Sequence, residues 1–501
     1  MENSNKKKMS ANGLALMILS SIFGFANVTV AYDQMGYASI MWYVFAAFIF
    51  FLPSGLMFAE YGSAFSDQKG GIYSWLKNSI GERLAFVGTF IWLAAWIIWM
   101  ISVSSKVWIP LSNIFFGTDK TSTWHLFGLF TPMQTIGILA IIWVLVVTLS
   151  ATQGFDQIAK ISGIGGFFSI ILPILFVVVS IVVLIANHGH LAQPVTGLSS
   201  FVQSPNAQFG NPIALMSFVV YAIFAYGGME TTGGVVDQVE NPKKNYPRGI
   251  IIAAIAMTLI YSLSIFFVGV TANWHQVLGN SSVNLGNITY VLTNNLGYVT
   301  AKTFGASSGV AIQVGNWFAR FAGLSMFISY VGAFFVLIYS PLKSFIEGSD
   351  ERIWPKKMIA LNKHGMPSFA MWLQAVIVAL VIFAISFGGA GAQKFYLILT
   401  DMGNISSTFP YLFLVAAFPF FKRLKGIDRP FVFFKNGWKT NLIVIVMFIV
   451  LALGISFTAI QPMLDGDFET AFWTIAGPIF FGLVGLILYQ FGLSRIKKSE
   501  K

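Results

Sequence analysis

The stretch FAYGGMETTGG, Phe224 to Gly234, lies in a segment long enough to cross a membrane, yet it carries four glycines, two threonines and the carboxylate of Glu230. In the hydrocarbon core, backbone that leaves the helix is tolerated only where protein or a cavity surrounds it. A charged side chain at that depth is costly and is by default a functional candidate. The stretch therefore predicts an interrupted helix that lines a site.

The composition around this stretch is that of an all-α, polytopic membrane protein. Of the 501 residues, 56% are hydrophobic and 10% are charged, whereas a soluble domain carries roughly 25% charged residues. Apolar runs of about 20 residues, each long enough for a ~30 Å hydrocarbon core, recur about twelve times. The predicted spans are 12–32, 38–60, 84–112, 132–152, 163–186, 213–233, 248–271, 316–340, 367–388, 394–420, 440–462 and 472–494.

The placement of positive charge predicts the orientation of these spans. Most of the 30 lysine and arginine residues fall in alternate connecting segments and in the two tails, among them Lys6 to Lys8, Lys243, Lys244 and the loop 421–439. Because such residues accumulate on the cytoplasmic side, both tails, 1–11 and 495–501, are expected there. The net charge of +11 follows from this orientation and from nearby anionic lipid, so no nucleic-acid partner is expected.

Two residue types bear on cofactors and catalysis. The chain has no cysteine, and its five histidines fall in predicted loops, so neither a metal site nor a bound cofactor is expected. The His188-x-His190 pair is interpreted as two solvated loop residues. Neither a G-x-x-x-x-G-K-[ST] phosphate loop nor an H-E-x-x-H motif occurs, which argues against an ATP-driven pump and against an enzyme.

The spans divide into two groups of five, 12–186 and 213–420, followed by the basic loop 421–439 and two further spans in 440–494. Because five is odd, a second group that repeats the first must cross the membrane upside down, as in many transporters. Gly24 lies near the middle of the first span, and Gly227 and Gly228 lie near the middle of the sixth. Both halves are therefore expected to be interrupted near the midplane.

An unwound turn exposes N–H groups at one half-helix end and C=O groups at the other, which together suit the carboxylate and ammonium of an amino acid. Close packing of helices is the alternative reason for such glycines, and it fits Gly24 alone better than the Gly227-Gly228 pair beside Glu230. Glu230 itself has two interpretations. It either caps the second half-helix, or it binds a proton or a substrate ammonium. In the second case it links the occupancy of the substrate site to the conformation of the protein.

Three groups of residues resemble the amino acid–polyamine–organocation superfamily. The first is FAYGGMETTGGVVDQVENPKKNYPRGI, Phe224 to Ile250, with its acid, Asn241-Pro242 and Pro247. The second is Glu60 followed by Gly70, Gly71, Tyr73, Trp75 and Gly81, and the third is Pro410-Tyr411-Leu412 with Ala416 and Ala417. Within the superfamily the chain is most similar to glutamate:GABA antiporter-type proteins and, among these, to YjeM-type bacterial inner-membrane transporters.

The resemblance implies two inverted five-helix repeats plus two extra helices, with substrate held by helices one, three, six, eight and ten. By the same resemblance, backbone at the two breaks contacts the substrate, Phe224 forms an aromatic gate and Glu230 serves coupling. Lys160 is similar to a lysine that replaces a sodium ion in some relatives, or else it is an ordinary basic flank. The implied substrate-binding residues are Ser20, Ser21, Gly24, Phe25, Tyr226, Gly227 and Gly228.

The sequence departs from the family pattern in two places. The family pattern has several glycines in the first helix, whereas this sequence has only Gly24 there. The eighth span, SYVGAFFVLIYSPLK, lacks the acid and the tryptophan expected of glutamate exchangers. Neither glutamate nor GABA is therefore assigned as substrate. The outer segment 272–315 resembles the extracellular gate region of the family, and a flexible loop is the alternative.

The expected protein is a secondary active amino acid transporter of the bacterial inner membrane that works by alternating access. Antiport of an amino acid or amine is favoured, and proton-coupled symport is the runner-up. A membrane channel or a membrane sensor is the alternative from another class.

Overall fold

The computed structural model describes residues 8–68, 71–230, 232, 236, 239–279, 283–435, 437–464 and 466–499. These residues form helices and connecting turns, with one isolated bridge that pairs Met9 with Val239. The predicted all-α class is confirmed for this part of the chain.

Ten helical stretches among the described residues are long and apolar enough to cross a membrane. In chain order they lie in α3, η1 and α4 (Ala38–Ala46, Ala47–Phe51 and Leu52–Ala64), α6 and α7 (Glu82–Lys106 and Trp108–Phe116), α8 (Pro132–Ala151), α9 (Phe155–Ala186), α11 (Pro242–Thr271), α14 and α15 (Ser308–Leu337 and Ser340–Gly348), α17 (Ser368–Phe387), α18 (Ala390–Arg423), α19 (Trp438–Leu464) and α20 (Phe468–Ser499). Shorter helices are α5 (Ile72–Ile80), α12 (Trp274–Val277), α13 (Ile288–Thr303) and α16 (Lys356–Ile359).

The other two predicted spans, 12–32 and 213–233, contain interrupted helices. In the first, α1 (Ala11–Ile22) and α2 (Phe25–Met35) are separated by extended backbone at Phe23 and Gly24. In the second, α10 (Pro212–Phe224) ends in turns that run from Ala225 to Gly228. The interruptions predicted from the glycines are therefore confirmed, and they explain why ten continuous spans are found where about twelve were expected.

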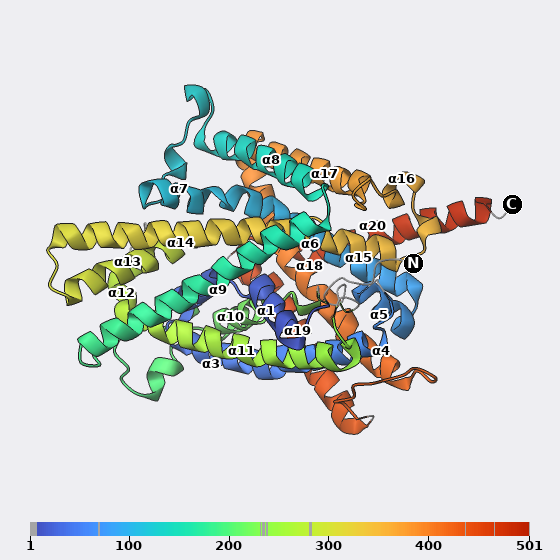
Figure 1. Cartoon of the computed structure of the whole chain (residues 1–501), viewed down its shortest axis with the longest axis horizontal. Helices are drawn as coiled ribbons and strands as arrows, with labels where there is room; N and C mark the ends of the chain where they lie inside the picture. The colour runs from blue at the N-terminus through green and yellow to red at the C-terminus, as the bar shows by residue number, and fades with distance from the viewer. Residues whose placement is uncertain are drawn as a thin grey trace.

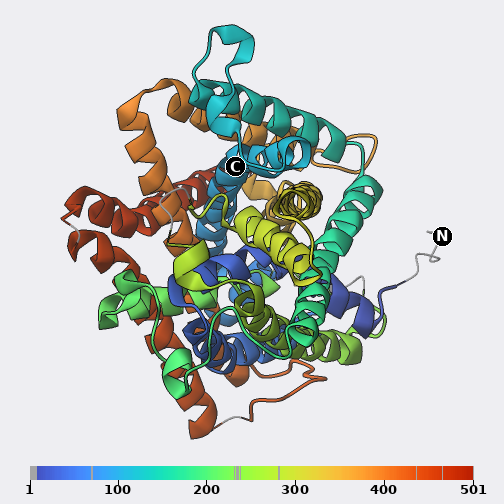
Figure 2. The same cartoon turned by 90° about the vertical axis from the view of Figure 1, so that its left-hand side faces the viewer.

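The helices form an elongated bundle (Figure 1). The segments α12 and α13 lie at one end of it, and α5, α15, α16 and the last turns of α20 lie at the other. Among the ten continuous spans α6 is the most enclosed, with 72% of its apolar window buried against 28% for α19 and α20. A view along the bundle shows α19 and α20, in orange and red, at its edge (Figure 2).

The glycines of the motif after Glu60 set the bounds of α5. Gly71 precedes the helix with φ of +50°, and Gly81 follows it with φ of +91°, values that side chains with a Cβ rarely adopt. Between them Trp75 is buried and stacks on Tyr61 of α4, with ring centroids 5.6 Å apart. The short helix is thereby fixed against the end of α4.

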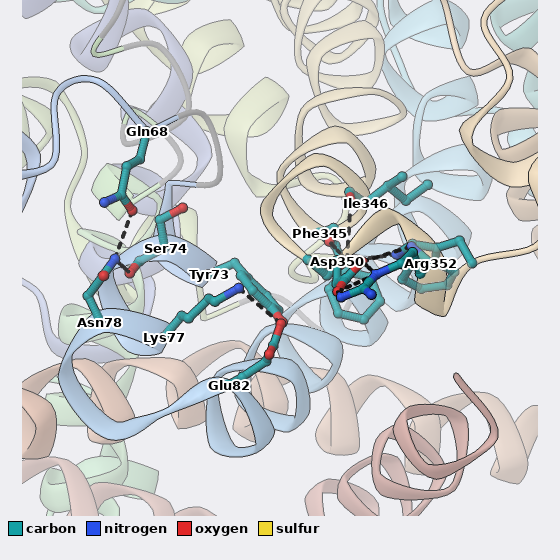
Figure 3. A network of polar contacts seen from close by, with 12 residues as sticks. Gln68, Tyr73, Ser74, Lys77, Asn78, Glu82, Phe345, Ile346, Asp350 and Arg352 are labelled. Carbon is teal, nitrogen blue, oxygen red and sulfur yellow. Dashed lines mark hydrogen bonds and ion pairs between the residues drawn. The ribbon is translucent and has the colours of Figure 1, made fainter. Parts of the chain in front are cut away.

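Polar contacts tie α5 to its surroundings (Figure 3). Lys77 donates a hydrogen bond to Glu82 at 3.0 Å. Close by, the Arg352 guanidinium lies 2.7 Å from Asp350 and holds the pKa of that carboxyl below its usual value. Asp350 therefore stays ionised at neutral pH and accepts a hydrogen bond from the backbone N–H of Arg352, at the start of a short 3-10 turn.

A buried ion pair joins α4 to α18 at the same end of the bundle. Lys422 Nζ lies 2.7 Å from Glu60 Oε2, and their side chains are 4% and 0% exposed. The second carboxylate oxygen accepts hydrogen bonds from the N–H groups of Phe433 and Phe434 at 2.9 and 2.6 Å. Both oxygens of Glu60 are thus satisfied, and the loop after α18 is held in place.

Replacing Lys422 with methionine leaves the Glu60 carboxylate buried without its counter-charge. Breaking a buried pair in this way costs about 3–5 kcal/mol, so we expect a marked fall in the thermal unfolding temperature of the purified protein in detergent. The double variant Glu60→Gln/Lys422→Met keeps an acceptor oxygen for the two N–H groups and should recover most of the stability.

Lys425→Met is the matched control. Lys425 lies three residues after Lys422, is exposed, and belongs to the loop that follows α18. If Lys422→Met and Lys425→Met unfold at the same temperature, the buried pair does not stabilise the fold.

Candidate functional site

Glu230 lies just after the interruption of α10 and is 2% exposed. The indole Nε1 of Trp92, on α6, donates a hydrogen bond to its Oε1 at 3.1 Å. The other oxygen accepts hydrogen bonds from the backbone N–H of Gly228 at 3.0 Å and from the hydroxyl of Tyr411, on α18. One carboxylate therefore joins the broken sixth span to two other helices.

Tyr411 contacts the interruption twice, because its hydroxyl also accepts a hydrogen bond from the N–H of Gly228 at 2.7 Å. Its ring is 5% exposed and packs edge-on against Phe50 with centroids 5.0 Å apart. Tyr411 was expected in a family motif but was not predicted as a site residue, and Trp92 was missed. Each joins Glu230 across more than 130 positions of sequence, which no local pattern could reveal.

The two interruptions meet at Gly228. Its φ is +115°, and a Cβ built on it would lie 3.3 Å from Cγ1 of Ile22, the last residue of α1. A glycine is needed here for both reasons, since a side chain would be strained in this conformation and crowded by α1. Gly228 therefore allows the two breaks to lie close together, and it also allows the backbone to turn where α10 is interrupted.

Tyr261 of α11 bridges the two breaks from the side. Its hydroxyl donates a hydrogen bond to the carbonyl of Ala225 at 3.0 Å and accepts from the N–H of Gly24 at 3.4 Å. The side-chain amide of Asn27 donates to the same hydroxyl at 3.3 Å, while its oxygen accepts from Tyr221. Tyr261 thus satisfies one backbone group from each interruption, and it was not predicted from the sequence.

Among the predicted site residues, Gly24, Gly227, Gly228 and Glu230 lie in or beside the two interruptions. Ser20 and Ser21 belong to the last turn of α1, but their side chains lie outside the described part of the structure. Phe224 ends α10 and is partly exposed, at 36%. Its predicted role as a gate stays a prediction.

Three other predicted residues have side chains directed elsewhere. The ring of Phe25 packs on Phe176 of α9, with centroids 5.2 Å apart, and that of Tyr226 stacks on Phe51 at 4.5 Å. Only their backbone is then available to a substrate at the breaks. Lys160 is exposed near the start of α9, and within the described residues its side chain has no hydrogen bond or ion pair. Its interpretation as a basic flank agrees with this position.

The outer segment 272–315 contains helix α13, which packs against α2. The hydroxyls of Thr29 and Thr289 lie 2.8 Å apart, and Tyr32 donates a hydrogen bond to the carbonyl of Ala272 at 2.7 Å. This part of the segment is therefore held against α2, the second half of the first predicted span. Residues 280–282 lie outside the described part.

Within the described ranges, no three acidic or histidine side chains lie together in a way that could hold a metal ion. The groups that converge at the breaks are a carboxylate, neutral hydroxyl and indole donors, and backbone ends.

Comparison with known proteins identifies the family. The family model for amino acid permeases matches residues 12–484. The chain belongs to the amino acid permease family. The inner membrane transporter YjeM of Escherichia coli (strain K12) is 48% identical to this permease over 496 residues, which cover 99% of this chain and 98% of that protein.

More distant relatives of this permease carry names that state substrates. The aspartate/glutamate permease AcaP of Lactococcus lactis subsp. cremoris is 23% identical and covers 86% of this chain and 83% of its own length. A glutamate/gamma-aminobutyrate antiporter of Lactococcus lactis subsp. lactis is 22% identical, covering 82% of this chain and 78% of its own. The resemblance stated from the motifs is confirmed: the permease is a bacterial inner-membrane transport protein and not an enzyme.

Replacing Gly228 with alanine places a Cβ at φ of +115° and against Ile22. Strain of this kind costs about 1–3 kcal/mol, so we expect substrate affinity to fall about tenfold in an uptake assay while membrane insertion is kept. Gly163→Ala is the control, because a Cβ at that position meets no atom within 4 Å. If Gly228→Ala keeps the substrate affinity of the unaltered protein, the close approach of the two breaks is not needed for substrate binding.

Tyr261→Phe leaves Gly24 N–H and Ala225 C=O without their shared partner. The matched control is Tyr61→Phe, which removes a buried hydroxyl that donates to a carbonyl at 3.1 Å, that of Leu414, away from the breaks. Each loss should cost about 1–2 kcal/mol of stability. Only Tyr261→Phe should also lower the affinity for substrate, measured as the KM of uptake, and equal KM values in the two variants would contradict the bridging role.

Proposed function

We propose that this permease is a secondary active transporter that works by alternating access and exchanges one amino acid or amine for another. The observation that carries the proposal is the meeting of two interrupted helices at Gly228, beside the buried carboxylate of Glu230. Interrupted helices are tolerated at membrane depth where they line a cavity, and paired half-helix ends suit both charges of an amino acid.

The proposed substrate position follows from the direction of the half-helices. The N-terminal end of α2 begins at Gly24 without a side-chain cap, so its N–H groups favour a carboxylate. The C-terminal ends of α1 and α10 present carbonyl oxygens, which favour an ammonium. Backbone from Ser20 to Phe25 and from Tyr226 to Gly228 would then form the binding site.

Glu230 would couple the occupancy of this site to the opening of the transporter. The carboxylate holds the broken sixth span to Trp92 of α6 and to Tyr411 of α18, so α6 and α18 cannot separate from that span while these hydrogen bonds persist. A proton or an ammonium on the carboxylate would compete for the same oxygens. Binding at the breaks and release of the adjoining helices are therefore linked through one side chain.

The architecture proposed with this function counts the two interrupted helices as spans. With them the chain crosses the membrane about twelve times, as two inverted repeats, 12–186 and 213–420, and two further helices in 440–494. Both tails would be cytoplasmic, and the last turns of α20 lie at the end of the bundle where α5, α15 and α16 lie (Figure 1). Proton-coupled symport is the second candidate, and the burial of Glu230 is the observation that favours it.

Transport into proteoliposomes tests the mode of transport. Purified protein is supplied with radiolabelled amino acids and amines, with and without unlabelled substrate inside, at two values of pH. We expect uptake that requires internal substrate. Uptake into empty vesicles driven by an imposed proton gradient would establish symport instead, and a folded protein that carries no compound of the panel would overturn the proposal.

Glu230→Gln keeps the shape of the side chain and removes its charge. We expect uptake to fall about tenfold or more and to lose its dependence on pH, because one charge-assisted contact contributes roughly 1.5–3 kcal/mol. Glu82→Gln, on the exposed Lys77 pair, is the control. An unchanged rate and pH profile in Glu230→Gln would remove this residue from the coupling role.

A further inference from the structure

A groove of about 450 Å³ lies between the start of α11 and the loop that follows α18. We call it the basic groove. Its lining residues are Lys243, Lys244, Pro247, Arg248, Ile251 and Ile252 of α11, with Pro430 and Phe431 of the loop. The transport mechanism described above makes no use of it.

Positive charge gathers at one end of the basic groove. Lys243 pairs with Asp428 of the loop at 2.7 Å, which fixes the two walls together. Lys244 and Arg248 are exposed, and within the described part of the chain their side chains have no hydrogen bond or ion pair. They are four residues apart, so they share one face of the helix. Two cations therefore remain available for an anion.

The rest of the groove is apolar and runs into the membrane-spanning part of α11. Ile251 and Ile252 continue the face that carries Lys244 and Arg248, about 5–6 Å beyond Arg248 along the helix. Phe431 lies opposite them on the loop wall. A polar anion fills only the charged end of such a groove, whereas a phospholipid fills both ends, with its phosphate at the cations and its chain on the apolar wall.

We propose that the basic groove binds an anionic phospholipid. Lys244 and Arg248 hold the phosphate, and Ile252 and Phe431 contact the part of an acyl chain nearest the headgroup. Charge complementarity selects this occupant, because anionic lipid is attracted to basic residues beside a membrane helix. The proposal does not depend on which substrate is carried.

A bound lipid would join two parts of the molecule that already meet here. The loop that carries Phe431 is held to Glu60 through the N–H groups of Phe433 and Phe434. The opposite wall is α11, whose Tyr261 bridges the two interruptions. The lipid would therefore fasten the helix that supports the candidate substrate site to the ion pair between α4 and α18.

The test is lipid binding by the purified full-length protein in a neutral detergent. Phosphatidylglycerol, phosphatidylcholine with the same chains, and glycerol 3-phosphate are titrated separately, and the thermal unfolding temperature and the bound lipid in native mass spectra are recorded. We expect stabilisation by phosphatidylglycerol alone. The variant Lys244→Gln/Arg248→Gln should bind it about 30-fold more weakly, since each charge near an anionic surface contributes about fivefold.

Two further variants separate binding in the groove from a general attraction between lipid and basic surface. Lys356→Gln/Lys357→Gln removes an exposed basic pair on α16 that does not line the basic groove, and this variant should bind the lipid as the unaltered protein does. Phe431→Ser keeps both cations and should weaken long-chain phosphatidylglycerol more than a short-chain form.

Three results would overturn the proposal. Equal stabilisation by phosphatidylcholine would show that charge does not matter, and equal stabilisation by glycerol 3-phosphate would show a site for a soluble anion. If Lys244→Gln/Arg248→Gln and Lys356→Gln/Lys357→Gln weaken the binding of phosphatidylglycerol equally, the effect is one of general surface charge.

Discussion

The structure depends on one requirement, which is that every backbone N–H and C=O at membrane depth must have a partner. In the ten longer spans that the structure describes, the helix itself supplies most of these partners. The segments at Phe23-Gly24 and Ala225-Gly228 leave the helix, so other parts of the chain must supply what the helix would have supplied. Tyr261 provides one hydroxyl for a group from each break, and Tyr411 provides another for the N–H of Gly228. The arrangement of α11 and α18 around the breaks follows from this need.

Two buried carboxylates show how differently the same group can be used. Glu60 faces an ammonium and two backbone N–H groups, so its charge is neutralised and its oxygens are occupied. The described contacts of Glu230 are with neutral donors, namely an indole, a phenol and backbone N–H. Breaking the first set would leave a buried charge without its partner, which is costly. The described contacts of Glu230 thus include no cation.

The sequence could predict the breaks because their cause is local. A glycine pair beside a carboxylate is rarely found inside an apolar run unless the helix is interrupted there, and Gly24 occupies the matching place in the first span. Trp92, Tyr261 and Tyr411 could not be predicted, because the chain has 14 tryptophans and 16 tyrosines and nothing in their neighbours marks these three. Their roles arise from contacts between distant helices. For Phe25 and Tyr226, the sequence placed both residues beside the breaks but could not show that both rings pack into the protein interior.

The position of α11 connects the site to the membrane surface. Its outer face begins with the exposed cations of the basic groove, and its interior face carries Tyr261 between the two breaks. A helix of this length is stiff over a few turns, since its backbone hydrogen bonds are internal. Tyr261 lies on the same helix, less than 20 residues beyond Lys243 of the groove. The loop wall of the groove is in turn held by Glu60. The ion pair and the loop wall of the groove are thus joined through Glu60, and α11 runs from the groove to the interrupted helices.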